Sequence, residues 1–290
     1  MLLTDLTNNK KIEVGSGLHI VSTPIGNRYD ITIRAILILS NSNVIVCEDT
    51  RVTKKLLNIL KISIRNKKWI SYNDYNASFK IKSILEEIAS GQVVSLVSDA
   101  GTPLLSDPGY KLVKEVLKRK LKITPVPGVS AITTSLIASG AKTDKFCFLG
   151  FLPKNKNKFI NVLREYSSLK ATLIIFEKSN RLKFLIETVK EHFNNSDIII
   201  TKELTKIHEE VIFVDSTNIE KYIKEDFNLK GELTIILDLN NSKKEKVFSN
   251  NELVEYLKTL KPSNVASMLA KSSSQKREEI YRRCIKLLKE

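Results

Sequence analysis

Short apolar runs alternate with longer amphipathic segments between residues 18 and 126. Compact runs rich in β-branched residues predict five strands, at residues 18–22, 43–47, 68–72, 92–97 and 122–126. The segments between them predict helices, around residues 33–39, 50–60, 77–90 and 110–119. Strands that alternate with helices of this length form β-α-β units. The pattern therefore predicts a parallel sheet for this part of the chain.

The pattern changes after residue 146. Four further apolar runs predict strands, at residues 171–176, 197–201, 211–215 and 231–237. Strands that outnumber helices favour a mixed sheet. The last fifty residues look helical and carry twelve Lys and Arg against six Asp and Glu.

These observations predict an α/β protein with two α/β domains. We expect an N-terminal extension at residues 1–17, a parallel-sheet domain at 18–135, a mixed-sheet domain at 136–240 and a basic helical tail at 241–290.

Four strands of the first domain lead directly into loops rich in turn formers and small polar residues. The loops are T-P-I-G-N (23–27), E-D-T-R (48–51), S-D-A-G-T-P (98–103) and P-G-V-S-A (127–131). In a parallel sheet they all lie at the carboxyl ends of strands, where open α/β sheets bind ligands. Turn chemistry alone explains one such loop but not four at one edge. We therefore expect a ligand site there.

The composition of these loops restricts the ligand. None matches G-x-x-x-x-G-K-[ST] or G-x-G-x-x-G, which argues against a phosphate cradle for a nucleotide. The loops offer backbone amides, small hydroxyls and carboxylates, which suit a zwitterionic ligand with an adenosine end. Pro103 and Pro108 stiffen the longest loop and lower the entropy cost of ordering it around a ligand.

The chain is strongly basic, with 47 Lys and Arg against 32 Asp and Glu and a net charge of +15. This excess favours a polyanionic partner, nucleic acid first and an anionic membrane surface second. The alternative is that the whole proteome is rich in Lys, Asn and Ile, which would raise the positive charge of its proteins in general. Three distant cysteines and three scattered histidines predict no disulfide framework and no metal site. We expect a cytoplasmic protein without a membrane segment.

The four loops, in this order and spacing, resemble the tetrapyrrole methylase superfamily, and more narrowly its ribosomal RNA branch. The resemblance continues in F-C-F-L-G-F-L-P (146–153), F-E-K-S-N-R (176–181), K-E-L-T-K (202–206) and K-G-E-L-T-I-I-L (230–237). It covers about residues 18–240, and residues 263–285 resemble, less specifically, a helical tail of that branch.

The resemblance implies two α/β domains with S-adenosylmethionine between them, a homodimer, and small-subunit rRNA or the 30S subunit as partner. The implied reaction is methyl transfer to the 2′-oxygen of a cytidine. It implies these cofactor-binding residues: Pro24, Gly26, Ser98, Asp99, Ala100, Gly101, Thr102, Asp107, Ser130 and Ala131. Simple turn geometry is an alternative or additional role for Gly26 and Gly101.

Three charged residues, Glu48, Asp49 and Arg51, follow a strand that reads as buried. Unpaired charges there would be costly. We expect Arg51 to contact substrate phosphate or ribose, and Glu48 or Asp49 to orient it or accept its proton. The alternative is a salt-bridged helix start with Asp49 or Thr50 as N-cap.

The chain departs from the branch pattern at three positions. Asn73 and Tyr75 stand where a His-rich Y-H-E-H-N-E stretch is usual, and Asn180 stands where His usually precedes Arg. An imidazole general base is therefore not expected here, and catalysis by positioning becomes more important.

For RNA contacts we expect five basic residues: Lys154, Lys156, Lys158, Arg181 and Arg277. A solvated basic face is the alternative for any one of them.

Two other functions stay open at this point. One is a methyltransferase of the same fold that acts on a tetrapyrrole or a protein side chain, and the other is a non-catalytic factor that binds RNA or the ribosome.

Overall fold

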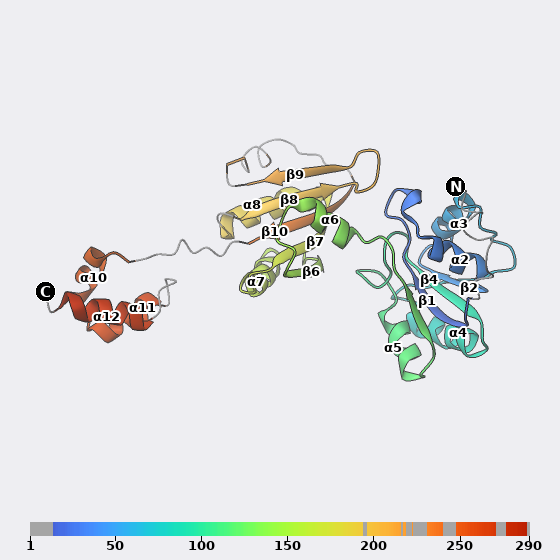
Figure 1. Cartoon of the computed structure of the whole chain (residues 1–290), viewed down its shortest axis with the longest axis horizontal. Helices are drawn as coiled ribbons and strands as arrows, with labels where there is room; N and C mark the ends of the chain where they lie inside the picture. Colours follow the sequence, from blue (N-terminus) through green and yellow to red (C-terminus); the bar gives the residue numbers. More distant parts are fainter. Residues whose placement is uncertain are drawn as a thin grey trace.

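Two five-stranded sheets, each covered by helices on both faces, dominate the structure (Figure 1). The structure is a computed structural model, and it describes residues 14–193, 196–215, 217–218, 222, 231–239, 248–270 and 277–288. Most of the predicted N-terminal extension, residues 1–13, therefore lies outside the described residues, as do parts of the tail.

The first sheet is entirely parallel, as the sequence predicts. Its strands are β1 (Gly17–Val21), β2 (Val44–Cys47), β3 (Lys68–Ser71), β4 (Val93–Val97) and β5 (Ile123–Val126), in the order β3-β2-β4-β1-β5. Every pair of neighbours is parallel. The strand and helix bounds predicted for this domain agree with the observed ones to within about two residues.

Alternate residues of the first sheet enter two separate cores. Val44 and Val46 pack with α4 (Ala77–Ala89) and α5 (Tyr110–Lys118). Ile45 and Cys47 pack on the other face with α2 (Ile33–Asn41) and α3 (Thr50–Ile59). A strand buried on both faces reads as a continuous apolar run, which is why V-I-V-C shows no alternation with polar residues.

The second sheet is mixed, also as predicted. It contains β6 (Phe146–Phe151), β7 (Thr172–Lys178), β8 (Asp197–Lys202), β9 (Glu210–Val214) and β10 (Glu232–Asp238), in the order β6-β7-β10-β8-β9. Only β6 and β7 are parallel, and the other pairs are antiparallel.

Strand β6 is not among the predicted strands, although its residues, F-C-F-L-G-F, form an apolar run. Its residues are at most half-buried, and its pairing with β7 shifts register between Phe148 and Gly150. Periodicity alone does not distinguish such a short apolar run from a segment of buried helix, and the bulge breaks the regular pairing of the strand.

Helices also cover both faces of the second sheet. Helix α6 (Ala131–Ser139) packs on one face, where Ile132 and Leu136 contact Ile174. Helices α7 (Lys156–Ser167) and α8 (Leu182–His192) cover the other face. The domain boundary predicted after residue 135 therefore falls inside a helix that packs on the second sheet.

The C-terminal tail is helical and has its own core. It contains α10 (Asn250–Leu257), α11 (Pro262–Ala270) and α12 (Arg277–Leu287). The core residues are Phe248, Leu253, Val265, Ala266, Leu269, Ile280 and Cys284. In the described part of the chain, no helix is long and apolar enough to cross a membrane.

Candidate functional site

Three of the four predicted loops are joined by hydrogen bonds at the carboxyl edge of the first sheet. Thr23 and Gly101 exchange backbone hydrogen bonds of 2.8 and 3.0 Å. The Ser22 and Thr102 hydroxyls lie 3.0 Å apart, and the Thr102 hydroxyl donates to the carbonyl of Val129 at 2.9 Å. Loops that are remote in sequence thus form one surface.

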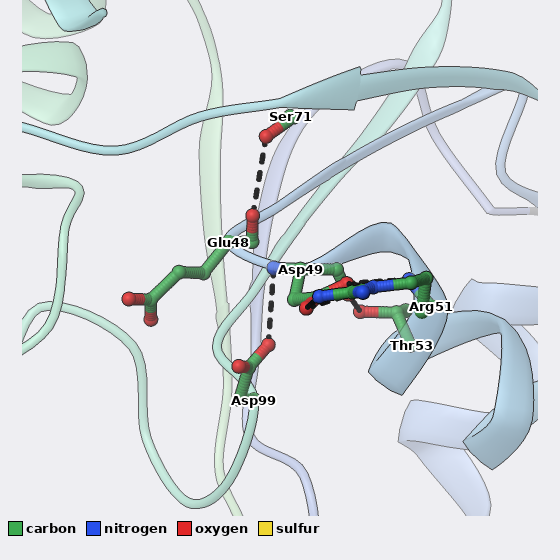
Figure 2. A network of polar contacts seen from close by, with 6 residues as sticks. All are labelled: Glu48, Asp49, Arg51, Thr53, Ser71 and Asp99. Atoms are coloured by element: carbon green, nitrogen blue, oxygen red, sulfur yellow. Dashed lines mark hydrogen bonds and ion pairs between the residues drawn. The ribbon is translucent and has the colours of Figure 1, made fainter. Parts of the chain in front are cut away.

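The E-D-T-R loop joins the same surface. The backbone N–H of Asp49 donates to the Asp99 carboxylate at 3.1 Å (Figure 2). On its other side, the Ser71 hydroxyl donates to the carbonyl of Glu48 at 3.2 Å. The structure therefore brings all four predicted loops together.

A cleft of about 730 Å³ opens between these loops and the second domain. Seven of the ten predicted cofactor residues line it: Asp99, Ala100, Gly101, Thr102, Asp107, Ser130 and Ala131. The second domain supplies the opposite wall, which includes Phe151, Phe176, Glu177, Leu233 and Thr234. The volume and the mixture of apolar walls with a few polar groups are typical of a small-molecule site.

The other three predicted cofactor residues support the cleft without lining it. The Ser98 hydroxyl donates to the carbonyl of Ala100 at 3.1 Å and fixes the loop that carries Asp99. Pro24 is buried beside the Thr23 bridge. A Cβ at Gly26 would lie 2.4 Å from Cγ of Lys206, so Gly26 permits close approach of the second domain.

The loop between β4 and α5 is held in an uncommon conformation. Leu104 and Ser106 have φ values of 75° and 66°, a region that side chains with a Cβ seldom adopt. Such strain persists only when surrounding contacts enforce it, and it is frequent in ligand-binding loops.

Carboxyl groups dominate the charge of the cleft. Burial, followed by the charge of Glu48, raises the pKa of Asp107 to about 6, although a hydrogen bond with Ser98 opposes the shift. Burial also raises the pKa of Asp99. Burial and the charge of Asp99 raise the pKa of Glu48. A chain with a net charge of +15 thus has an acidic cleft, which suits a cationic ligand.

Asp49 and Arg51 form the salt-bridged helix start that the sequence allowed as an alternative. The Asp49 carboxylate accepts the Arg51 backbone N–H at 2.8 Å, as the N-cap of α3, and lies 2.6 Å from Nη2 of Arg51. These contacts lower the pKa of Asp49 to about 2. The Glu48 carboxylate points away from the pair (Figure 2). Glu48 is therefore the member of this group whose carboxylate stays outside the ion pair.

Comparison with known proteins decides the family. The model of the tetrapyrrole (corrin/porphyrin) methylases matches residues 17–220. The chain belongs to this family. It is therefore a methyltransferase, and S-adenosylmethionine is its methyl donor.

Curated relatives resemble this methylase along most of its length. One from Rickettsia prowazekii, named ribosomal RNA small subunit methyltransferase I, is 44% identical over 83% of this chain and 85% of its own. A protein of the same name from Mycoplasma genitalium is 38% identical over 91% of this chain and 96% of its own.

Solved structures share the fold at low sequence identity. A diphthine synthase matches with a TM-score of 0.59 at 16% identity, over 76% of this chain and 89% of its own. A uroporphyrin-III C-methyl transferase from Thermus thermophilus, complexed with S-adenyl homocysteine, matches with a TM-score of 0.52 at 14% identity, over 76% of this chain and 96% of its own.

The cleft of this methylase has the properties that S-adenosylmethionine requires. The cofactor carries a sulfonium and an ammonium, and Asp99 and Asp107 offer carboxylates to such charges. Ile25, Phe151 and Leu233 provide apolar surface for an adenine ring. The described residues therefore fit the cofactor in charge and polarity.

The sequence analysis missed Glu177 in the second-domain wall. Its side chain is only 2% exposed, Oε1 accepts the Lys178 backbone N–H at 2.9 Å, and Oε2 lies 3.5 Å from Nη2 of Arg181. Oε2 has no hydrogen-bond partner among the described residues, and Glu177 lines the cleft. The signal was its place in F-E-K-S-N-R, from which only Arg181 was selected.

The predicted RNA-binding residues have different surroundings. Arg181 is 20% exposed and donates to the carbonyls of Leu152 and Pro153, so its guanidinium holds the connection between β6 and α7. Lys154 and Lys158 are exposed, and Lys156 pairs with Glu191 at 2.8 Å. Arg277 is exposed and donates to the Ser267 hydroxyl at 2.9 Å.

Among the described residues no group of His, Cys, Asp and Glu is arranged to hold a metal ion.

The raised pKa of Asp107 predicts a pH-dependent gain of stability for Asp107→Asn. The pKa of about 6 in the folded protein exceeds the ordinary value of 3.8. The folded state therefore holds a proton that the unfolded state releases, so the wild type loses stability as pH rises from about 4 to about 6. We expect Asp107→Asn to raise the free energy of unfolding by about 1–3 kcal/mol at pH 7.5 and by little at pH 4.

Urea unfolding of the cofactor-free protein at both pH values measures this effect. Glu86→Gln, on the exposed side of α4, is the matched control and should change little at either pH. An equal gain at pH 4 and pH 7.5 would contradict the role assigned to burial of the Asp107 carboxyl.

Proposed function

We propose that this methyltransferase modifies the 2′-oxygen of a cytidine in the RNA of the small ribosomal subunit. The observation that carries the proposal is the 44% identity over most of both chains to a protein named ribosomal RNA small subunit methyltransferase I. The acidic cofactor cleft inside a chain of net charge +15 agrees with it, because a polyanionic substrate requires basic surface outside the cleft.

The proposed function assigns one group of residues to the cofactor and another to the RNA. The ten predicted cofactor residues bind or support the cofactor, either in the cleft wall or in the loops behind it. When bound, S-adenosylmethionine supplies an activated methyl group on a sulfonium. Because the donor is already activated, much of the protein's contribution is to position the ribose in line with the methyl–sulfur bond.

Glu48 is the proposed acceptor of the 2′-hydroxyl proton. Its pKa is raised by burial and neighbouring carboxyls, which makes it a better base than an ordinary surface carboxylate. Asp49 is proposed to hold Arg51 in place, and the exposed Arg51 guanidinium to contact a phosphate or ribose of the RNA. The absence of an imidazole at Asn73, Tyr75 and Asn180 is consistent with a carboxylate in the basic role.

Three finer expectations belong to the same proposal. We propose a homodimer that works in the cytoplasm, and RNA contacts through Lys154, Lys156, Lys158, Arg181 and Arg277. For Arg181, the hydrogen bonds to the carbonyls of Leu152 and Pro153 favour an indirect role, in which it holds the segment just before Lys154 in place. We also propose the four-part division at residues 17, 135 and 240, with α6 as the shared helix across the second boundary.

The test of the substrate is tritiated methyl transfer. Small subunits from a strain that lacks the modification should accept label from S-adenosylmethionine, and nucleoside digestion should place it on a 2′-O-methylcytidine. Label on a tetrapyrrole or a protein instead would support the methyltransferases of other specificity. Cofactor binding by calorimetry without any transfer would support a non-catalytic factor.

Single substitutions separate the roles in the E-D-T-R loop. Glu48→Gln should lower the single-turnover rate by about 10²–10⁴-fold, the usual contribution of a general base, with little change in cofactor affinity. Arg51→Ala should mainly raise the KM for RNA. Asp49→Ala should also remove the N-cap of α3, at a cost of about 1 kcal/mol, whereas Asp49→Asn keeps a cap.

Rapid quenching under saturating cofactor and RNA measures the single-turnover rates. The same measurement over a series of RNA concentrations gives the KM for RNA. A wild-type rate in Glu48→Gln together with a wild-type KM for RNA in Arg51→Ala would rule out the assignment.

Binding of the RNA should depend steeply on salt. Lys158→Ala should lower the slope of log K against log salt by about one phosphate contact, whereas Lys67→Ala should leave it unchanged, because Lys67 already donates to the carbonyls of Ser40 and Ser42. Fluorescence anisotropy between 50 and 300 mM salt measures the slope. A wild-type slope near zero would count against an RNA substrate.

A further inference from the structure

Three aromatic side chains stand in water beside the cleft. Tyr75, Phe79 and Tyr110 are 95%, 82% and 67% exposed, and we call them the aromatic rim. Leaving a ring of this size in water forgoes the free energy of burying it. Three such rings in one region are typical of a contact surface.

The fold brings the aromatic rim to the carboxyl edge of the first sheet. Tyr75 precedes α4 and Phe79 lies in its first turn, so both follow β3. Tyr110 is the first residue of α5, which follows β4. Strands β3 and β4 both run parallel to β2, and α4 and α5 pack in one core on one face of the sheet. The amino ends of the two helices therefore lie at the same edge and on the same face.

This edge adjoins the cofactor cleft. The loop that carries Tyr75 is bonded to Ser71 through Asn76, and the Ser71 hydroxyl donates to the carbonyl of Glu48. The next backbone N–H, that of Asp49, donates to Asp99 in the cleft wall. On the other side, the cleft-lining residues Leu105, Ser106 and Asp107 precede Tyr110 by only a few residues. The aromatic rim thus lies at the same edge of the first sheet as the cofactor cleft.

Hydrogen bonds hold the loop that carries Tyr75. The Asn73 side chain accepts the backbone N–H groups of Tyr75 and Asn76 at 3.1 and 3.0 Å. The Asn76 side chain accepts the Asn73 N–H at 2.9 Å and donates to the carbonyl of Ser71 at 3.1 Å. A fixed loop presents the ring at a low entropy cost on binding.

We propose that the aromatic rim is a stacking platform for unpaired bases of the substrate RNA. The inference rests on the proposed function and names the form of RNA that the site takes. Proteins that read single-stranded RNA stack splayed bases on Tyr and Phe rings. Stacking needs no phosphate contact, so it tolerates the carboxylates of Glu48 and Asp74. The exposed Lys80, Lys82 and Lys111 on the same two helices offer phosphate contacts farther out.

The test uses a 12-nucleotide single-stranded RNA and a duplex of the same sequence. Tyr75→Ala, Phe79→Ala and Tyr110→Ala should each raise the Kd for the single strand about tenfold, within the range known for loss of one stacked base. Tyr75→Phe keeps a ring and should bind like the wild type. The duplex should bind more weakly, with a Kd that the three substitutions leave unchanged.

Two controls keep this test independent of the proposed function. Phe213→Ala, at a 56% exposed ring in β9 of the other sheet, should leave the Kd unchanged. Affinity for S-adenosylmethionine should be the same in all variants. The wild type could fail to transfer a methyl group to rRNA while the alanine variants still bind the single strand more weakly than the wild type does. That combination would refute the proposed function and support the stacking platform.

Other outcomes would overturn the platform. Equal losses for the single strand and the duplex would assign the rings to backbone contacts. A change in sedimentation coefficient without a change in RNA affinity would assign them to a protein interface. Wild-type Kd values in the three alanine variants would leave the rings without an RNA role.

Discussion

The parallel alignment of β2, β4, β1 and β5 is the constraint on which the rest of the structure depends. Because adjacent strands run in the same direction, each releases its following loop at the same edge. Hydrogen bonds between Thr23 and Gly101, and between Asp49 and Asp99, then join loops that are separated by fifty to eighty residues. The second domain closes the surface into a cleft through Phe176, Glu177 and their neighbours.

The distribution of charge separates two tasks within one basic chain. Asp99 and Asp107 make the cleft acidic, and partial burial together with the charges of neighbouring carboxylates raises the pKa of both and of the nearby, exposed Glu48. A cationic methyl donor benefits from that field, whereas an RNA backbone is repelled by it. A phosphate chain would therefore be held on the outer basic surface, with only a ribose directed inward. Neutral aromatic rings at the edge of the cleft are compatible both with its negative charge and with the positive charge of the outer surface.

The two acidic residues of the E-D-T-R loop have different roles. The Asp49 carboxylate accepts a hydrogen bond from the first turn of α3 and pairs with Arg51, so it is poorly suited to take a proton. Glu48, one residue earlier, points the other way (Figure 2), and partial burial and the charge of Asp99 raise its pKa. Adjacent residues of the same charge thus differ in chemistry because Asp49 is the N-cap of α3, whereas Glu48 lies one residue outside the helix start, directly after β2 ends at Cys47.

The sequence by itself determined the two sheet types, the strands and helices of the first domain, and the four loops. These features depend on local periodicity and on turn residues, which a single chain carries openly. It did not identify β6, because a short apolar run such as F-C-F-L-G-F fits a strand or a buried helix segment equally well, and it did not reveal the packing of α6 on the second sheet. It predicted Arg181 as an RNA contact, and the tertiary structure shows that this guanidinium also donates to the carbonyls of Leu152 and Pro153. Only the tertiary structure brought Glu177 to the cleft wall and gathered Tyr75, Phe79 and Tyr110 at one edge, because such contacts join segments whose separation in sequence carries no local signal.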